Sequence, residues 1–302
     1  MPLFAIDLDG TLLDHTGRVS AANVLAVQRA RAAGFRVVVC TGRGLTESRR
    51  AIEAIEQRDP CVVVGGAIIA CPQTGATQHR FALPLHTATE AVAEVVSHGF
   101  PALVFKDPAE SSYDYLVVTG AQGHALDPVT KWWFGEMNLR VRTVATLDED
   151  DHPEHTVRVG ACGLSGRMGP LASAIGARCA TDTVMHHFPA VVAPDFAKVT
   201  AAGETLHIFE MFSAAATKWS AIRVLAGWWG IEDQDIIAIG DQINDVCMIQ
   251  NAGIGIAMEN AIPEVKAVAD HITASNNNDG VAQAINRIID GATRHQALGI
   301  RH

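Results

Sequence analysis

The sequence predicts an α/β protein whose core is a doubly wound parallel sheet, and three observations support this fold class. Short apolar runs alternate with segments of helical spacing in the first part of the chain. The same alternation returns in the last third, after a long stretch in which it loosens. The runs themselves are apolar throughout, which is typical of strands that are buried on both faces of a parallel sheet.

The first expected elements follow one another as strand, helix, strand, helix and strand. Residues 3–6 (LFAI) form a short apolar run, and residues 20–34 have helical spacing, with Ser20 as the N-cap and Gly34 as the stop. The next elements are expected as a strand at 35–43, a helix at 47–57 and a strand at 61–69. This order predicts three buried, parallel strands.

The later part of the chain predicts how the domains are organised. The expected elements there are strands at 206–212, 235–241 and 253–258, and helices at 218–230, from about Asn244, and at 281–291. The stretch before them is richer in His, Pro, Tyr and Trp and contains strand-like pieces at 113–120 and 155–162. We therefore expect a core of residues 1–83 and 188–302, interrupted by an inserted smaller α/β domain at 84–187.

Composition and charge exclude several classes of protein. The 302 residues are 48% hydrophobic and 19% charged, which is typical of a folded globular chain. A net charge of −10 argues against nucleic acid as a partner, because phosphate backbones are bound by clustered Lys and Arg. The sequence shows neither a basic leader nor a long apolar run, and its six cysteines form no C-x-x-C pair. We expect a soluble, cytoplasmic protein with no membrane partner; the oligomeric state is left open.

Polar residues follow several of the expected strands, at the edge where parallel sheets bind ligands. They are Asp7 and Asp9, then Thr41, Gly42 and Arg43, and later Asp241 and Asp245, with Lys218 at a helix start. Carboxylates gathered in one crevice repel one another unless a cation neutralises them, so the pattern favours a divalent ion with oxygen ligands. A calcium loop of the EF-hand type is excluded, because Leu12 stands where Gly is required and Arg18 where Glu is required.

Four stretches together resemble the motifs of the haloacid dehalogenase (HAD) superfamily of phosphohydrolases. They are DLDGTLL at 7–13, TGR at 41–43, TK at 217–218 and GDQINDVCMI at 240–249. The stretches at 252–273 and 276–285 further resemble the C-terminal pattern of the Cof-like branch. This resemblance implies a Rossmann-like catalytic core, with residues 84–187 as the inserted cap of that branch.

The resemblance also implies a role for each polar residue. Asp7 would be the nucleophile that forms an aspartyl-phosphate, and Asp9 would be the general acid and base. Mg²⁺ would be held by Asp7, Asp9 through its backbone carbonyl, Asp241 and Asp245. The implied phosphate-binding residues are Gly10, Thr11, Thr41, Gly42, Lys218 and Asn244, and Arg43 is expected to contribute to substrate selectivity.

The implied activity is a Mg²⁺-dependent phosphatase that acts on a small phosphorylated metabolite, such as a sugar phosphate or a phosphorylated cofactor. Two alternatives stay open. A phosphotransferase or phosphomutase would use the same Asp7 nucleophile but keep water away from the phosphoenzyme. A binding or regulatory module would keep the fold without turnover.

Two histidine pairs lie outside these motifs, His152 with His155 and His186 with His187. Neither has the carboxylate context of a metal site in the sequence, so we expect both pairs to be surface histidines.

Overall fold

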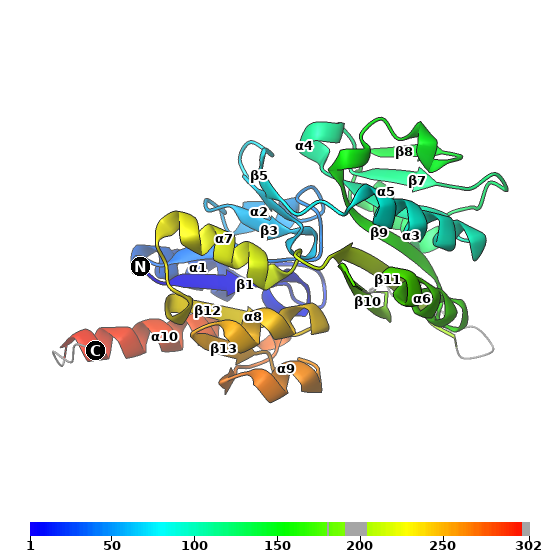
Figure 1. The fold of residues 1–302 in the computed structure, drawn as a ribbon. Coiled ribbons are helices and arrows are strands. Elements are labelled where there is room, and N and C mark those ends of the chain that lie inside the picture. The colour runs from blue at the N-terminus through cyan, green and yellow to red at the C-terminus, as the bar shows by residue number, and fades with distance from the viewer. Residues whose placement is uncertain (180, 191–203, 298–302) are drawn as a thin grey trace. The chain divides into compact units, whose positions relative to one another are not determined.

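The computed structural model describes residues 1–179, 181–190 and 204–297, with side chains as far as residue 291. It divides the chain into two compact units, one made of Met1–Ala76 and Thr217–His302 and the other of Thr77–Ala216 (Figure 1). The parts of the expected core at 191–203 and 298–302 lie outside the described residues. Within the described ranges, no helix is both long and apolar enough to cross a membrane.

The first unit is built on a five-stranded sheet in which every pair of neighbours is parallel. Its strands are β1 (Leu3–Ile6), β2 (Arg36–Val39), β12 (Ile236–Gly240), β13 (Ile254–Ala257) and β14 (His271–Ile272). The strand order is β14-β13-β12-β1-β2. After β1 the chain adds β2 on one side of it, and later it adds β12, β13 and β14 on the other side. The order therefore reverses between β1 and β12, which is where ligands bind in sheets of this kind.

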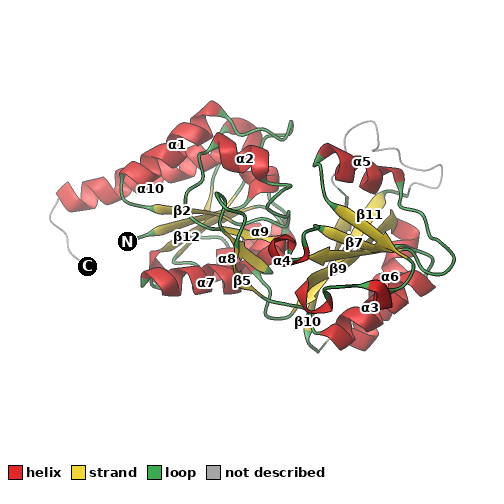
Figure 2. Ribbon diagram, turned by 90° about the horizontal axis from the view of Figure 1, so that it is seen from above, coloured by secondary structure: helices red, strands yellow, loops and turns green. Residues whose placement is uncertain are grey.

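Helices cover both faces of this sheet. They are α1 (Ala21–Ala32), α2 (Arg49–Ala54), α7 (Lys218–Trp229), α8 (Val246–Asn251), α9 (Pro263–Val268) and α10 (Gly280–Ala297). Figure 2 shows α1 and α10 on one face and α7 and α8 on the other. The predicted caps form at α1, where the Ser20 side chain accepts a hydrogen bond from the backbone N–H of Asn23. The doubly wound core is confirmed.

The predicted third strand at 61–69 is right only at its start, where a strand forms and Val62 makes a parallel bridge to Cys40, and wrong beyond it, because the chain turns back into a second short strand. β3 (Cys61–Val63) and β4 (Ile68–Ala70) pair antiparallel with each other. Between them Val64, Gly65 and Gly66 have φ values of 53°, 66° and 107°, which turn the chain back on itself. A β-branched residue such as Val64 rarely adopts a positive φ, so the apolar run conceals the turn in the sequence.

The second unit contains a six-stranded sheet in the order β10-β11-β9-β6-β7-β8, antiparallel except between β7 and β8. Its strands are β6 (Ala102–Lys106), β7 (Tyr115–Val118), β8 (Val141–Val144), β9 (Thr156–Leu164), β10 (Thr183–Pro189) and β11 (Leu206–Ser213), and β5 (Thr77–Arg80) precedes them. We expected residues 206–212 in the core sheet, and this is wrong: β11 hydrogen-bonds to β9 and β10.

One face of the second sheet is covered by α3 (Leu85–Ser97) and α6 (Ser165–Cys179), which share an apolar core with it. Val95 and Leu171 from the helices pack in this core with Val104, Val159 and Phe209 from the strands. Two short helices complete the unit, α4 (Pro108–Ser111) and α5 (Pro128–Glu136). The unit extends seven residues before and 29 residues after the expected insertion. The later extension arises because the antiparallel sheet takes up β11. That the units act as a catalytic core and a cap stays a prediction.

Candidate active site

Two acidic residues end the two strands that flank the reversal of strand order. Asp7 directly follows β1, and its backbone N–H donates to Ile239 of β12 at 3.0 Å. Asp241 directly follows β12. Both side chains are buried, with 4% and 3% of each residue exposed. Parallel strands end at the same edge of the sheet, so this topology places two carboxylates beside each other although they are 234 positions apart in the sequence.

The loop after β1 turns back against Asp241. Gly10 has a φ of 74°, and a Cβ at this position would lie 2.3 Å from Oδ2 of Asp241. The next residue, Thr11, is fully buried and donates its hydroxyl to Oδ1 of Asp241 at 3.0 Å. Glycine is therefore required both for the backbone conformation and for the close approach of the loop to the carboxylate.

Lys218 joins this edge of the sheet from α7. Its Nζ donates to Oδ1 of Asp7 and to Oδ1 of Asp245, each at 2.6 Å, and its side chain is fully buried. Thr217 caps the helix by accepting from the backbone N–H of Ser220. Gly66 fixes the position of this helix start, because a Cβ there would lie 2.2 Å from the backbone carbonyl of Thr217.

Asp245 both binds Lys218 and organises the loop after β12. Its Oδ2 accepts from the backbone N–H groups of Asp241 and Gln242 at 2.9 Å and 3.0 Å. A Cβ at Gly240 would lie within 2.7 Å of this carboxylate, so the strand must end in glycine. These contacts hold the backbone of Asp241 in place.

Asp7, Asp241 and Asp245 form a buried carboxylate cluster in which one oxygen from each lies within 4.8 Å of the others. Burial, followed by the charge of Asp245, raises the pKa of Asp7 well above its usual range, and Lys218 opposes this rise. Burial, again followed by Asp245, raises the pKa of Asp241 to about 7. Burial lowers the pKa of Lys218, but the Asp245 and Asp7 carboxylates outweigh it and the net shift is upward. One ammonium thus faces three carboxylates, a donor set that fits a hard divalent cation.

Asp9 lies apart from this cluster and is paired with Arg43. The guanidinium donates from Nε to Oδ2 of Asp9 at 2.8 Å and from a second nitrogen to Oδ1. The Asp9 side chain is 39% exposed, whereas that of Arg43 is 19% exposed. Both oxygens of the Asp9 carboxylate therefore bind Arg43, and Asp9 is not one of the three acids grouped around Lys218. We expected Arg43 to contribute to substrate selectivity, and the structure shows in addition that it is paired with Asp9.

The remaining predicted residues, Thr41, Gly42 and Asn244, come from the loops after β2 and β12. Thr41 is fully buried, and its hydroxyl accepts from the backbone N–H of Arg43 at 3.1 Å. A Cβ at Gly42 would lie 3.6 Å from Nδ2 of Asn244, so these two loops meet there. All the residues that we predicted from the sequence lie in the first unit, at the carboxyl edge of its sheet.

Two asparagines that we did not predict also support the loop after β1. Asn260 donates to the carbonyl of Gly10 at 2.8 Å, and Asn276 donates to the carbonyl of Leu13 at 2.8 Å. Asn260 and Asn276 are themselves joined, since the side-chain oxygen of the first accepts from the backbone N–H of the second. Both lie in the C-terminal stretches that carried the family resemblance, but sequence alone does not reveal a partner about 250 residues away.

The sequence matches the family of haloacid dehalogenase-like hydrolases over residues 4–124 and 177–285. Two Bacillus subtilis (strain 168) proteins are similar over nearly their whole lengths. The 5-amino-6-(5-phospho-D-ribitylamino)uracil phosphatase YwtE is 29% identical over 305 residues, covering 96% of this chain and 99% of that protein. The phosphatase YwpJ is 27% identical over 303 residues, covering 96% and 100%.

Solved structures share the fold. A haloacid dehalogenase-like hydrolase from Bacteroides thetaiotaomicron superposes with a TM-score of 0.75 at 24% identity. The superposition covers 95% of this chain and 99% of that chain. At this level of identity the similarity concerns the architecture, and it extends over both units.

Proposed function

The chain belongs to the haloacid dehalogenase-like hydrolases, and from this premise we propose that it is a Mg²⁺-dependent phosphatase acting on a small phosphorylated metabolite. One observation carries the proposal: the Asp7 carboxylate is buried at the reversal of strand order, between Lys218 and two further acids. A buried carboxylate that accepts a hydrogen bond from a lysine is a suitable nucleophile, because the ammonium favours its ionised form and so opposes the effect of burial and of the neighbouring acids.

The proposed reaction has two steps. A carboxylate oxygen of Asp7 attacks the phosphorus, and the bond between phosphorus and the alcohol oxygen breaks. Asp9 donates a proton to the leaving alcohol. In the second step Asp9 removes a proton from a water molecule, whose oxygen attacks the phosphorus and restores the Asp7 carboxylate as inorganic phosphate leaves. For this role Asp9 must part from Arg43, and its partial exposure makes such a movement inexpensive.

We propose that Asp7, Asp241 and Asp245 hold Mg²⁺, together with the backbone carbonyl of Asp9. The carboxylate cluster fits this ion because its donors are all oxygens and because one lysine leaves its negative charge uncompensated. When bound, Mg²⁺ supplies positive charge that offsets the charge developing on the phosphoryl group. The chain's own groups do the rest of the binding: Lys218, the Thr41 hydroxyl, Asn244 and the backbone N–H groups near Gly10, Thr11 and Gly42 are the proposed phosphoryl ligands.

The proposed ligands named above bind only the phosphoryl group and the ion, so other groups must recognise the alcohol part of the substrate. We propose that the second unit acts as a cap that supplies this selectivity, together with Arg43. The face of its sheet opposite α3 and α6 carries chemistry suited to recognition, namely the ion pair between Arg158 and Glu210, flanked by the aromatic rings of Tyr115 and Phe212.

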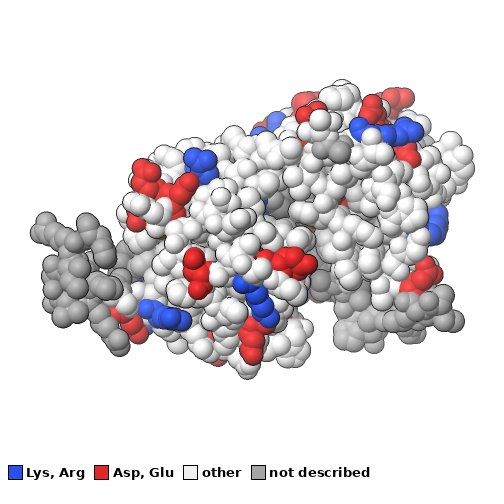
Figure 3. Space-filling view, turned by 60° about the horizontal axis from the view of Figure 1, so that its bottom comes forward, with Lys and Arg blue, Asp and Glu red and all other residues white. Residues whose placement is uncertain are grey.

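The substrate class is a sugar phosphate or a phosphorylated cofactor. YwtE, which is 29% identical, is named for a phosphorylated ribitylaminouracil. On the face shown in Figure 3, the described Lys and Arg side chains lie singly or beside acidic ones. A nucleic acid is bound by clustered basic side chains, so this distribution supports a small substrate instead. A cytoplasmic location is supported by the six cysteines, all of which are free thiols.

The test replaces the nucleophile. Asp7→Asn keeps the shape of the side chain but supplies a poor nucleophile, so we expect phosphate release from a panel of phosphorylated metabolites to fall by at least about 1,000-fold. Asp182→Asn, in an exposed turn of the second unit, is the matched control and should leave the rate unchanged. An Asp7→Asn variant with a tenth of the parent activity would rule out the covalent mechanism. A burst of phosphoenzyme without continuing phosphate release would instead indicate a phosphotransferase or phosphomutase.

A further inference from the structure

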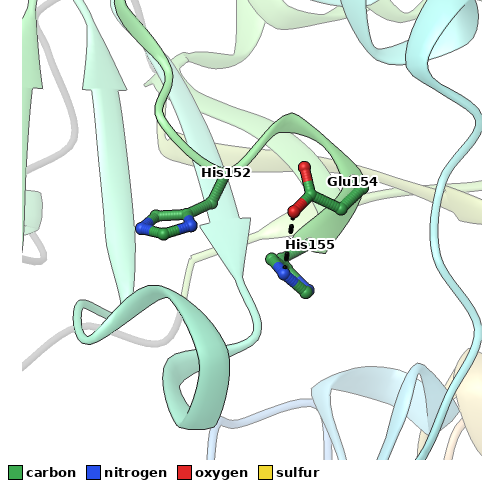
Figure 4. Close-up of side chains that lie close together, drawn as sticks. All are labelled: His152, Glu154 and His155. Atoms are coloured by element: carbon green, nitrogen blue, oxygen red, sulfur yellow. Dashed lines mark ion pairs between the residues drawn. The ribbon is translucent and has the colours of Figure 1, made fainter.

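Three side chains with metal-binding groups lie close together in the second unit, at the turn before β9 (Figure 4). His152, Glu154 and His155 each offer one ligand atom, and the three atoms lie within 4.8 Å of one another. Oε1 of Glu154 is 3.0 Å from Nε2 of His155, and the two imidazole centroids are 5.9 Å apart. We expected surface histidines without the carboxylate context of a metal site, but the structure pairs the His155 side chain with that of its sequence neighbour Glu154.

The local sequence explains why these side chains converge. Residues Pro153–His155 form a single 3-10 turn, and three residues per turn place positions 152 and 155 on the same side. The ring of Pro153 fixes the start of that turn. The carbonyl of His152 accepts from the backbone N–H of His155 at 3.0 Å, and the carbonyl of His155 accepts from the N–H of Asp107 at 2.8 Å. The turn is therefore anchored to the end of β6.

Electrostatics favour a cation at this turn. Residues 147–155 contain five acidic residues, of which Asp150 is paired with Lys106 and Asp151 with Arg142. Glu154 faces His155 and is 63% exposed. Nδ1 of His155 is buried and has no hydrogen-bond partner in the part of the chain that is described. Within the described residues, the polar contact of the His155 imidazole is therefore with Glu154, another member of the cluster.

We propose that His152, Glu154 and His155 bind a divalent transition-metal ion, with Zn²⁺ as the best fit. Two imidazoles and one carboxylate match the nitrogen and oxygen ligands that zinc prefers, and three protein ligands leave a position for water. Imidazole is a poor ligand for Mg²⁺, so this site differs in selectivity from the carboxylate cluster of the first unit. Two ligands at about 2.1 Å from a tetrahedral ion are about 3.4 Å apart, close to the separation of Glu154 and His155. Rotation of the His152 side chain closes the remaining distance.

The proposal has a consequence for the fold as well as for binding. An ion held by all three side chains joins the two ends of the turn that leads into β9, a central strand of the second sheet. Because the unfolded chain does not present these ligands together, bound zinc stabilises the folded second unit. We therefore expect zinc to raise the Tm of this unit.

The experiment is a calorimetric titration of the metal-free full chain with Zn²⁺, with excess Mg²⁺ present to occupy the carboxylate cluster. We expect one tightly bound zinc per chain. The double variant His152→Ala/His155→Ala should bind this zinc at least about 100-fold more weakly, since loss of even an indirect partner of a ligand costs 10- to 100-fold. Glu154→Gln should weaken binding about tenfold or more. The matched control is His186→Ala/His187→Ala, which removes a histidine pair from β10 of the same unit and should leave the affinity unchanged.

Two further measurements separate this site from the carboxylate cluster. Asp241→Asn damages that cluster and should still bind one zinc, so this result is independent of the proposed phosphatase activity. Co²⁺ should give visible absorption bands in the parent chain that disappear in the histidine double variant. Circular dichroism of each metal-free variant checks that it is folded. The proposal is overturned if the parent binds no zinc, if the histidine double variant binds it with unchanged affinity, or if Glu154→Gln has no effect.

Discussion

Lys218 offers the sharpest test of how the carboxylate cluster is held together. Its Nζ donates to Asp7 and to Asp245 at 2.6 Å, and none of its side chain is exposed. Lys218→Met keeps the length and the apolar part of the side chain but removes the charge. In the absence of a metal ion, the variant leaves two buried carboxylates facing each other without a counter-charge.

The magnitude follows from this arrangement. Removing one partner of a buried ion pair typically costs about 3–5 kcal/mol of unfolding free energy. Burial already raises the pKa of Asp7, and Lys218 opposes that rise, so the pKa of Asp7 rises further in the variant. A carboxyl whose folded pKa is raised stabilises the fold at low pH, and this contribution is lost as the pH rises through the folded pKa. The cost of the substitution is therefore smaller at pH 5 than at pH 8.

The assay is thermal unfolding of the metal-free protein at both pH values, with Lys131→Met as the matched control. Lys131 lies on α5 and is exposed, so its loss should change little. A domain of the size of the first unit loses about 2–4 °C in Tm per kcal/mol, so the expected drop at pH 8 is roughly 6–20 °C. Phosphate release should also fall by at least about 100-fold, because a charged phosphoryl ligand is lost.

The refuting result is equally definite. A Lys218→Met variant whose stability at pH 8 stays within about 1 kcal/mol of the parent would show that the lysine does not compensate the buried acids. A loss of stability that is larger at pH 5 than at pH 8 would show that protonation of the buried carboxyls does not relieve the loss of the lysine, contrary to the reasoning above.

Three further predictions address the same site. Excess chelator should stop phosphate release and Mg²⁺ should restore it, whereas Ca²⁺ should restore little, because it accepts longer and more numerous oxygen contacts; full activity in chelator would contradict the metal assignment. Gly66→Ala should lower both Tm and kcat, because its Cβ would strike the backbone of Thr217 at 2.2 Å. The control is Gly75→Ala, because Gly75 also has a positive φ but no atom lies within 4 Å of where its Cβ would be. This variant should lose only the stability that backbone strain costs and should keep its kcat. Equal effects of the two substitutions would refute the role of the close approach at Gly66. Arg43→Ala should change the ranking of substrates by kcat/KM. The control Arg49→Ala, at an exposed position on α2, should leave the ranking unchanged. An unchanged ranking in Arg43→Ala would show that Arg43 does not contribute to substrate selectivity.

The elements that sequence predicted correctly are those whose pattern is local. The run at 3–6 is β1, and the segment of helical spacing after Ser20 contains α1. Asp7 and Asp241 were found because each directly follows an apolar strand, and parallel strands end at a common edge. Strand burial and helix caps depend on neighbours within a few residues, so they can be read from the chain itself.

The elements that sequence predicted wrongly depend on distant partners. The apolar run at 206–212 has the composition of a core strand, yet β11 pairs with β9 of the second unit, and its residue pattern does not specify which sheet it joins. The run at 61–69 is broken by positive φ values at Val64, Gly65 and Gly66, which place Gly66 against the start of α7. Glycine is needed there both for the φ of 107° and for the close approach to Thr217, a contact with a residue more than 150 positions away in the sequence.

The sequence by itself determined the fold class, the family resemblance and the set of acids at the carboxyl edge of the sheet, because alternating strands and helices and short motifs are local. Only the tertiary structure decided which of those acids meet. It gathers Asp7, Asp241 and Asp245 around a common centre, but it pairs Asp9 with Arg43 instead. It also turns the side chains of the adjacent residues Glu154 and His155 toward each other. The physical reason is that pairing of charges depends on distance and burial in the folded chain, and neither quantity is encoded in the order of residues along one segment.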